Sequence, residues 1–152
     1  MKAETLGETL HGHPFTKKFQ PHHMDILTEL AREVRFDKDR IIFRQGDECR
    51  TFYLILSGSV ALELKGPNRT FLILTLGAGD ELGWSSVVMS EGRHFEARAL
   101  ESVRALAFDG ARLLQACKEH PTLGYAVMHR LLGVVSNRLQ VTRLQLMDVY
   151  AR

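Results

Sequence analysis

The pattern of apolar and polar residues divides the chain into three zones with no linker between them. Residues 14–33 carry apolar side chains at roughly helical spacing, which predicts a helical N-terminal arm. Residues 34–108 contain short β-rich runs separated by glycine-containing turns, and residues 111–150 return to helix-forming sequence. This order predicts one domain that is mainly β with flanking helices.

The middle zone has the sequence pattern of a small all-β structure. Its β-rich runs read RIIFRQGD, TFYLILSGSVALELKGPN, TFLILTLGAGDELG and HFEARALESVRALAF. In VALELK the alternation places Glu63 and Lys65 on the face opposite to Leu62. Residues 52–56 and 71–76 are apolar on both faces, as expected for strands enclosed in a sandwich or barrel. Repeated short strands with turn signals indicate an antiparallel roll or barrel.

The C-terminal zone predicts two helices. Pro121 separates a short helix, GARLLQACKEH, from an uninterrupted one over residues 122–149. Seven positions of the long helix are spaced alternately by four and three, and we call them the a/d stripe: Met128, Leu132, Val135, Leu139, Thr142, Leu146 and Val149.

The a/d stripe has two explanations. It forms either the core stripe of a helix lying along the barrel or the interface of a homodimer. Leu131, Val134 and Val141 widen its first half enough to cover the barrel as well. Because the strict pattern continues past the length that one small barrel can cover, we favour a homodimer through residues 122–150.

Composition narrows the class of protein. The 152 residues suit a single domain, and the net charge of +2 is too small to indicate nucleic acid or an anionic membrane as a partner. No apolar run approaches the length of a membrane-spanning helix, and the N-terminus resembles neither a signal peptide nor a transit peptide. Cys49 and Cys117 have no CxxC spacing. We therefore expect reduced thiols in a cytoplasmic protein without membrane contact.

Four segments resemble the cyclic nucleotide-binding domain of the Crp/Fnr family: IIFRQGDECRTFYLILSGSVALEL, LGAGDELG, RHFEARALES and NRLQVTRLQLMDVY. The resemblance runs from about residue 15 to the end of the chain. It implies a jelly-roll-like β-roll flanked by helices and usually dimeric through the last helix. In the activators of this family a helix-turn-helix domain follows that helix, whereas this sequence ends at Arg152. We expect no DNA binding by this chain alone, whether it is a stand-alone sensor or a piece of a longer protein.

The resemblance also implies a ligand site. The family's phosphate-binding cassette places a Gly-Glu pair ahead of an Arg-Ser pair, and Gly83 and Arg93 fall on the two residues that hold the phosphate of a ligand such as cAMP or cGMP. Trp84 takes the place of the glutamate that accepts from the ribose, and His94 takes the place of the serine. An alternative register uses Glu81 as the carboxylate but needs compensating gaps.

The long helix contributes one more candidate. Thr142 takes the place of the threonine with which family members reach the adenine base. Alternatively, its hydroxyl bonds to a carbonyl of its own helix. Either way, the candidate site spans the β-roll and the last helix.

The residues themselves favour an anion. Backbone amides at 83–86, the hydroxyls of Ser85 and Ser86 and the fork of Arg93 all suit phosphate or carboxylate. Trp84 cannot accept a hydrogen bond, so a buried ribose hydroxyl would lose about 1–3 kcal/mol there. We expect anion recognition without tight conventional binding of cAMP or cGMP. Alternatively, Trp84 plugs the pocket and leaves a ligand-free module that binds an unknown protein partner.

Enzymes and haem sensors are the remaining classes. A metal-dependent cupin needs a His-x-His and Glu cluster on strands, whereas the His-x-His at His11 and His13 precedes the β-rich region. No nucleophile–base pair is evident. A haem sensor would use His94 or Cys49 as axial ligand, but no pattern supports either. The sequence therefore predicts a non-enzymatic sensor domain.

Overall fold

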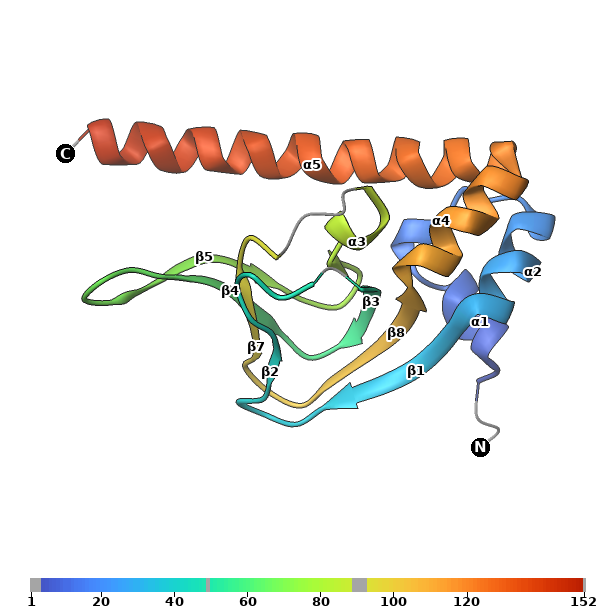
Figure 1. Ribbon diagram of the computed structural model, residues 1–152, viewed down its shortest axis with the longest axis horizontal. Helices are drawn as coiled ribbons and strands as arrows, with labels where there is room; N and C mark the ends of the chain where they lie inside the picture. The colour runs from blue at the N-terminus through green and yellow to red at the C-terminus, as the bar shows by residue number, and fades with distance from the viewer. Residues whose placement is uncertain (1–3, 49, 89–92, 152) are drawn as a thin grey trace.

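The β-strands form two antiparallel four-stranded sheets. The computed structural model describes residues 4–48, 50–88 and 93–151. One sheet has the order β1 (Ala31–Phe36), β8 (Val103–Asp109), β3 (Thr51–Ser57) and β6 (Glu81–Leu82); the other has β2 (Ile41–Phe43), β7 (Glu96–Ala99), β4 (Val60–Lys65) and β5 (Thr70–Leu76). Together they make the β-roll seen in Figure 1. The predicted antiparallel, jelly-roll-like β-roll with flanking helices is confirmed.

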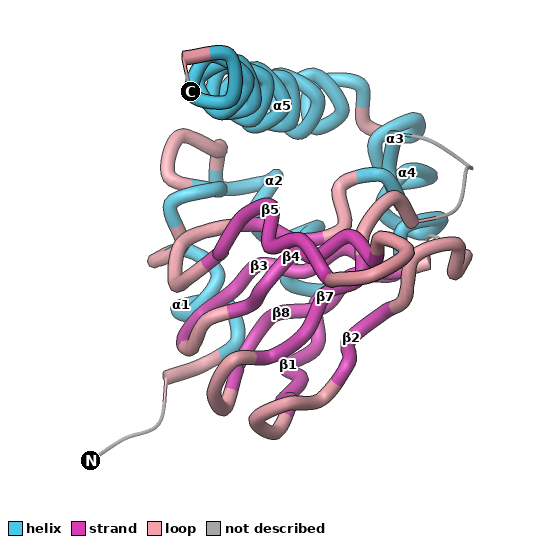
Figure 2. The backbone as a smooth tube through the Cα atoms, turned by 90° about the vertical axis from the view of Figure 1, so that its left-hand side faces the viewer, coloured by secondary structure: helices cyan, strands magenta, loops and turns pink. Residues whose placement is uncertain are grey.

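The helices gather at one end of the roll and along its top. They are α1 (Leu6–His11), the 3₁₀ turn η1 (Pro14–Thr16), α2 (Pro21–Leu30), α3 (Ser85–Val88), α4 (Gly110–Glu119) and α5 (Pro121–Tyr150). Figure 1 shows α1, α2 and α4 together at one end of the roll, and Figures 1 and 2 both show α5 lying over the strands. One core cluster joins these helices to β3 and β8, and a second fills the space between the sheets.

The N-terminal arm differs from the prediction in two ways. Residues 31–33 are not helical, because Ala31–Phe36 pairs along its whole length with β8. The β-roll therefore begins three residues before the predicted boundary at 34. Helix α1 was not predicted; a capping box between Thr5 and Glu8 begins it, and the fully buried Leu10 anchors it.

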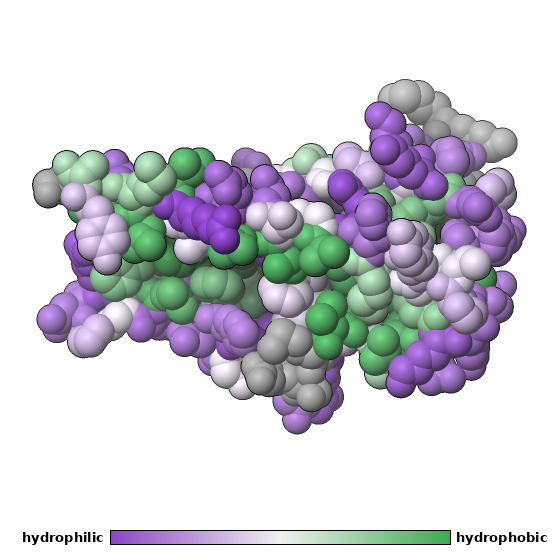
Figure 3. Space-filling view, turned by 90° about the horizontal axis from the view of Figure 1, so that it is seen from above, coloured by the Kyte–Doolittle hydropathy of each residue, from purple (hydrophilic) through white to green (hydrophobic). Residues whose placement is uncertain are grey.

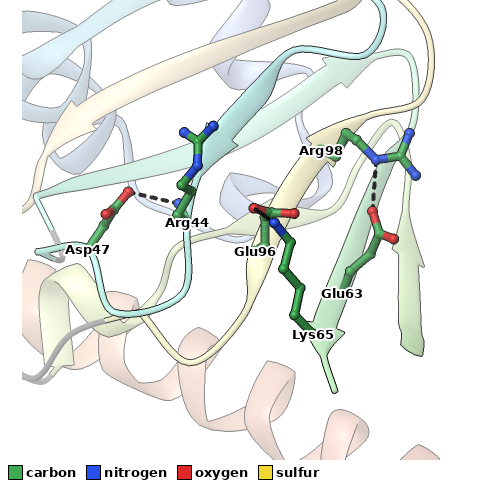
Figure 4. A network of polar contacts seen from close by, with 6 residues as sticks. All are labelled: Arg44, Asp47, Glu63, Lys65, Glu96 and Arg98. Carbon is green, nitrogen blue, oxygen red and sulfur yellow. Dashed lines mark hydrogen bonds and ion pairs between the residues drawn. The ribbon is translucent and has the colours of Figure 1, made fainter. Parts of the chain in front are cut away.

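Strand β4 departs from simple alternation. A register shift lies between Leu62 and Glu63, and Glu63 is buried although alternation places it on the face opposite to the buried Leu62. Its carboxylate accepts from Arg98 Nε at 2.8 Å. The directly opposite residue on β7, Glu96, is also buried and pairs with Lys65 at 3.4 Å. Figure 4 shows the two pairs, Glu63 with Arg98 and Glu96 with Lys65. Because each carboxylate has a cationic partner, Glu63 and Glu96 can be buried.

Strand β5 is an edge strand, since it pairs with β4 alone. The exposed fractions of Phe71 and Leu72 are 41% and 60%. The expectation that residues 71–76 are enclosed on both faces is therefore wrong for the first half of the strand. In Figure 1 the β4–β5 hairpin extends beneath the C-terminal half of α5.

Helix α5 packs on the roll through a different stripe from the a/d stripe. Its buried residues are Leu123, Val127, Leu131 and Val134. By contrast, Leu132 and Leu139 of the a/d stripe are 67% and 51% exposed. The a/d stripe is thus not the core stripe of this helix. Among the described residues, no helix has the length and apolar character needed to cross a membrane.

Candidate functional site

Gly83 and Arg93, the two residues predicted to hold the phosphate, lie in direct contact. Gly83 has a φ of 82°, and a Cβ added there would stand 2.6 Å from the carbonyl oxygen of Thr51 and 2.7 Å from Nη1 of Arg93. Arg93 is buried, donates from Nη2 to the Thr51 carbonyl at 2.7 Å, and lies 4.3 Å from the centre of the Phe43 ring. The missing side chain at Gly83 therefore makes room for the guanidinium.

The short helix α3 follows Gly83 and Trp84, and its two serines have different roles. Ser86 donates its backbone N–H and its hydroxyl to the Gly83 carbonyl, at 3.0 and 2.7 Å. Ser86 thus closes the turn and is not the free donor that we expected. Ser85 lines the cavity beside Arg93, whose Nη1 donates to its hydroxyl at 3.5 Å.

Two cavities meet at Trp84. The smaller, about 40 Å³, is bounded by Gly83, Ser85 and Arg93. The larger, about 290 Å³, lies between the roll and α5. Trp84 is half-buried and lines both, as does the exposed His94. The predicted site residues on the roll, other than Ser86, therefore surround one continuous region.

The larger cavity is walled mainly by apolar side chains. They come from the roll and from α5: Leu62, Ile73, Leu74, Phe95, Val135, Leu139 and Val141. Thr142 and Gln145 are the polar residues of α5 toward the C-terminal end of this wall. Thr142 donates its hydroxyl to the Arg138 carbonyl at 2.9 Å, the within-helix bond considered as the alternative to base contact. It still lines the cavity, so its oxygen stays beside any occupant.

Arg138 was missed by the sequence reasoning. It projects from α5, lines both cavities, and donates to the backbone oxygen and the carboxylate of Glu81 at 3.0 and 3.2 Å. Burial raises the pKa of Glu81 and lowers the pKa of Arg138. A signal was present, because Arg138 precedes Thr142 by four residues and shares its helix face.

The Arg138–Glu81 pair also bears on the alternative register of the cassette. In that register Glu81 would be the carboxylate for the sugar. In the structure it is turned to Arg138 and lines a third cavity, of about 280 Å³, with Asp80 and Arg130. Glu81 is absent from the walls of the two cavities that meet at Trp84.

The model of the cyclic nucleotide-binding domain family matches residues 33–120, more than half of the chain. The chain belongs to this family. The match covers the whole β-roll after the start of β1, including Gly83 and Arg93, and extends through α4.

The chain is similar in sequence to bacterial regulators of this family. It is 27% identical over 131 residues to a CRP-like cAMP-activated global transcriptional regulator of Mycobacterium tuberculosis, covering 86% of this chain and 57% of the relative. It is 28% identical over 138 residues to the cyclic AMP receptor protein of Thermus thermophilus, covering 89% and 61%. The chain thus spans about three fifths of the length of these curated relatives.

A solved cyclic nucleotide-binding domain from Methylobacillus flagellatus has the same fold. Its TM-score is 0.81 at 22% identity, over 89% of this chain and 79% of that one. Within the described part of the chain, no group of three His, Cys, Asp or Glu residues could hold a metal ion. Cys49, one of the two residues considered for haem ligation, lies outside the described residues.

Proposed function

We propose that this protein is a non-enzymatic sensor domain that binds a cyclic nucleotide or another small anion and signals through α5. Binding would take place in the cavities between Gly83, Arg93 and the helix. The charged group of the ligand would occupy the smaller cavity, where Arg93 and Ser85 offer donors. Its remaining atoms would extend past Trp84 into the larger one.

One observation carries the proposal: the larger cavity is walled by the roll on one side and by α5 on the other. A ligand seated there touches Leu62 and Phe95 of the roll together with Val135 and Leu139 of the helix. Its binding energy therefore depends on how α5 lies on the roll, which is the condition for a ligand to shift a conformational equilibrium. Arg138 joins the same helix to β6, the strand just before Gly83.

The relatives support this proposal. The Mycobacterium tuberculosis relative is described as cAMP-activated, and the Thermus thermophilus relative as a cyclic AMP receptor. A cavity of about 290 Å³ beside Trp84 favours a ligand site over a pocket filled by the indole. The alternative, a ligand-free module that binds a protein partner, predicts that no small anion affects the domain.

The proposal is tested by thermal unfolding with cAMP, cGMP and inorganic phosphate, for wild type, Arg93→Ala and Arg112→Ala. Arg112 is an exposed arginine of α4 and is the matched control. We expect a ligand-dependent rise in Tm for wild type and Arg112→Ala that Arg93→Ala lacks. Since Arg93 also bonds to Thr51, the comparison uses the shift caused by ligand and not the starting Tm. Equal shifts in all three proteins, or no shift in any, would contradict the proposal.

We further propose that the protein is a homodimer through the a/d stripe of α5. Three residues of the stripe repeat every seven positions: Leu132, Leu139 and Leu146. Tyr125 lies seven residues before Leu132, and all four side chains are more than half exposed. In Figure 3 hydrophobic residues gather along the face of the molecule that carries α5. Packing these residues against a second copy would bury them in the heptad geometry of a two-stranded coiled coil. The ligand cavity and the dimer interface would then share Val135 and Leu139.

A further inference from the structure

We propose that the natural ligand is an anion whose charged group is joined directly to a ring-sized apolar body, and that the site does not recognise ribose hydroxyls. The chemistry is that of an aromatic phosphate monoester or an aromatic carboxylate. This inference rests on the proposed function, because it assumes that an anion binds at Arg93. It goes further by assigning the part of the ligand that follows the charged group.

The first step concerns the atoms next to the charged group. Trp84 lines both the small cavity at Arg93 and the large one under α5. A ligand that occupies both must therefore pass the indole. An indole donates one hydrogen bond and accepts none, so a hydroxyl on this part of the ligand finds no acceptor on Trp84. An apolar ring, by contrast, can stack against the indole face.

The second step concerns the carboxylates near the site. Among the described residues, no Asp or Glu lines either cavity. Glu81, the carboxylate of the alternative register, is paired with Arg138 at 3.2 Å. Recruiting it to a sugar would separate two buried charges that now neutralise each other, which is costly. Glu81 is therefore already engaged and is not a partner for a ribose hydroxyl.

The third step concerns the shape and polarity of the large cavity. Its walls are mainly aliphatic and aromatic, with contributions from β4, β5 and α5 such as Leu62, Leu74 and Leu139. Its volume of about 290 Å³ admits a body of two fused rings. Thr142 and Gln145 supply polar atoms at one part of the wall, so a ring substituent there can be polar. The anion is favoured by Arg93 and Arg138, which both line the small cavity.

Isothermal titration calorimetry with matched probes tests the inference. 1-Naphthyl phosphate and ribose 5-phosphate carry the same charged group on an apolar and on a hydroxylated body. We expect 1-naphthyl phosphate to bind at least about tenfold more tightly, because its rings remove apolar surface from water. 1-Naphthoate distinguishes a carboxylate ligand from a phosphate ligand. Tighter binding of ribose 5-phosphate would overturn the inference.

A second pair isolates a single hydroxyl. We expect cAMP and 2′-deoxy-cAMP to bind within about threefold of each other, since the 2′-hydroxyl has no partner at Trp84. In Trp84→Gln the amide oxygen is an acceptor without charge, so this variant should prefer cAMP over the deoxy form. Trp84→Phe keeps an aromatic ring and is the control. A tenfold or larger preference of wild type for cAMP would show that the hydroxyl is recognised and would overturn the inference.

The two levels of the proposal fail in different ways. If no phosphate probe binds, or if Arg93→Ala binds all of them as wild type does, the anion site itself is wrong. If the probes bind through Arg93 but the hydroxylated bodies bind more tightly, the anion site stands and the assigned ligand class is wrong. Circular dichroism melts of the Trp84 variants identify any that fail to fold. The wild-type comparisons remain decisive in that case.

Discussion

Arg138 of α5 donates to both the backbone oxygen and the carboxylate of Glu81, at 3.0 and 3.2 Å. Glu81 belongs to β6 and lies two residues before Gly83, so this pair ties the long helix to the strand that leads into the candidate site. The exposed fractions of the two side chains are 20% and 9%. A movement of α5 away from the roll would leave both charges without their partner. The pair is therefore one direct link between the candidate ligand site and the helix, beside the bond from Gln145 Nε2 to the Ile73 carbonyl at 3.0 Å.

Removing the arginine should destabilise the fold in a pH-dependent way. Arg138→Met leaves the buried Glu81 carboxylate unpaired, at a cost of about 3 kcal/mol near pH 7. Burial already raises the pKa of Glu81, and loss of the arginine raises it further. As pH falls through this raised pKa, Glu81 takes up a proton and the penalty disappears. Urea unfolding of the variant and wild type at about pH 7.5 and pH 5 measures the difference.

The double variant Arg138→Met/Glu81→Gln is the control for this prediction. It removes the unpaired carboxylate, so most of the lost stability should return and the pH dependence should be weak. A single variant that is destabilised equally at both pH values would show that the charge pair is not the cause. The change would then reflect lost packing of the arginine stem.

Gly83 should tolerate no side chain. Gly83→Ala places a Cβ within 2.7 Å of both the Thr51 oxygen and Arg93, on a backbone with φ of 82°. We expect a loss of about 1–3 kcal/mol in unfolding free energy, with weaker anion binding because Arg93 must move. Chemical unfolding and the ligand-dependent Tm shift give the two readouts.

Gly133 provides the opposite case. It lies in α5, where an added Cβ meets nothing within 4 Å. Gly133→Ala should therefore raise the unfolding free energy by roughly 0.5–1 kcal/mol through helix propensity. Equal effects at the two glycines would contradict the geometric explanation for Gly83.

His13 should make stability depend on pH below the neutral range. Its Nδ1 accepts from the Phe15 N–H at 3.0 Å, which leaves Nε2 to donate to the Ile55 carbonyl at 3.1 Å. Burial lowers the pKa of His13, so the unfolded chain binds the proton more readily. The stability that neutral His13 contributes is complete above its unfolded pKa of about 6.5 and falls as pH decreases toward the folded value.

Variants at three histidines separate the contribution of His13 to pH-dependent stability from the contributions of other histidines. His13→Gln should be less stable at about pH 7.5 and should lose less stability than wild type between there and pH 5. His23 is also buried with a lowered pKa, so His23→Gln reports its separate share of the slope. His11 is exposed, and His11→Gln should match wild type throughout. An unchanged slope in His13→Gln would rule out this role.

The a/d stripe predicts the effect of a charge on assembly. Leu139→Asp places two carboxylates in the middle of the proposed dimer interface and should raise the dimer dissociation constant at least about 30-fold. Sedimentation velocity over a range of concentrations measures it. Leu144→Asp changes a residue of similar exposure, 56% against 51%, outside the stripe and should leave the dimer intact. A wild-type monomer, or equal effects of both variants, would contradict the dimer.

The sequence allowed the β-roll and the two C-terminal helices to be predicted, because turn residues and periodicity are local signals. The strand at Ala31–Phe36 was missed, since its partner β8 lies about seventy residues away in the chain. The burial of Glu63 was not predicted, because alternation separates the two faces of a strand but does not reveal charged neighbours such as Arg98. Likewise, Arg138 was not predicted as a site residue, because its place in the cavity walls depends on how α5 lies over the roll.

The most direct measurement is a fluorescence titration of Trp84, the only tryptophan of the chain, with phenyl phosphate. Trp84 lines both cavities, so an anion held at Arg93 must change its surroundings. We predict a saturable change in emission for wild type and Arg112→Ala that Arg93→Ala lacks. The same saturable change in all three proteins, or no change in wild type, would contradict anion binding between the roll and α5.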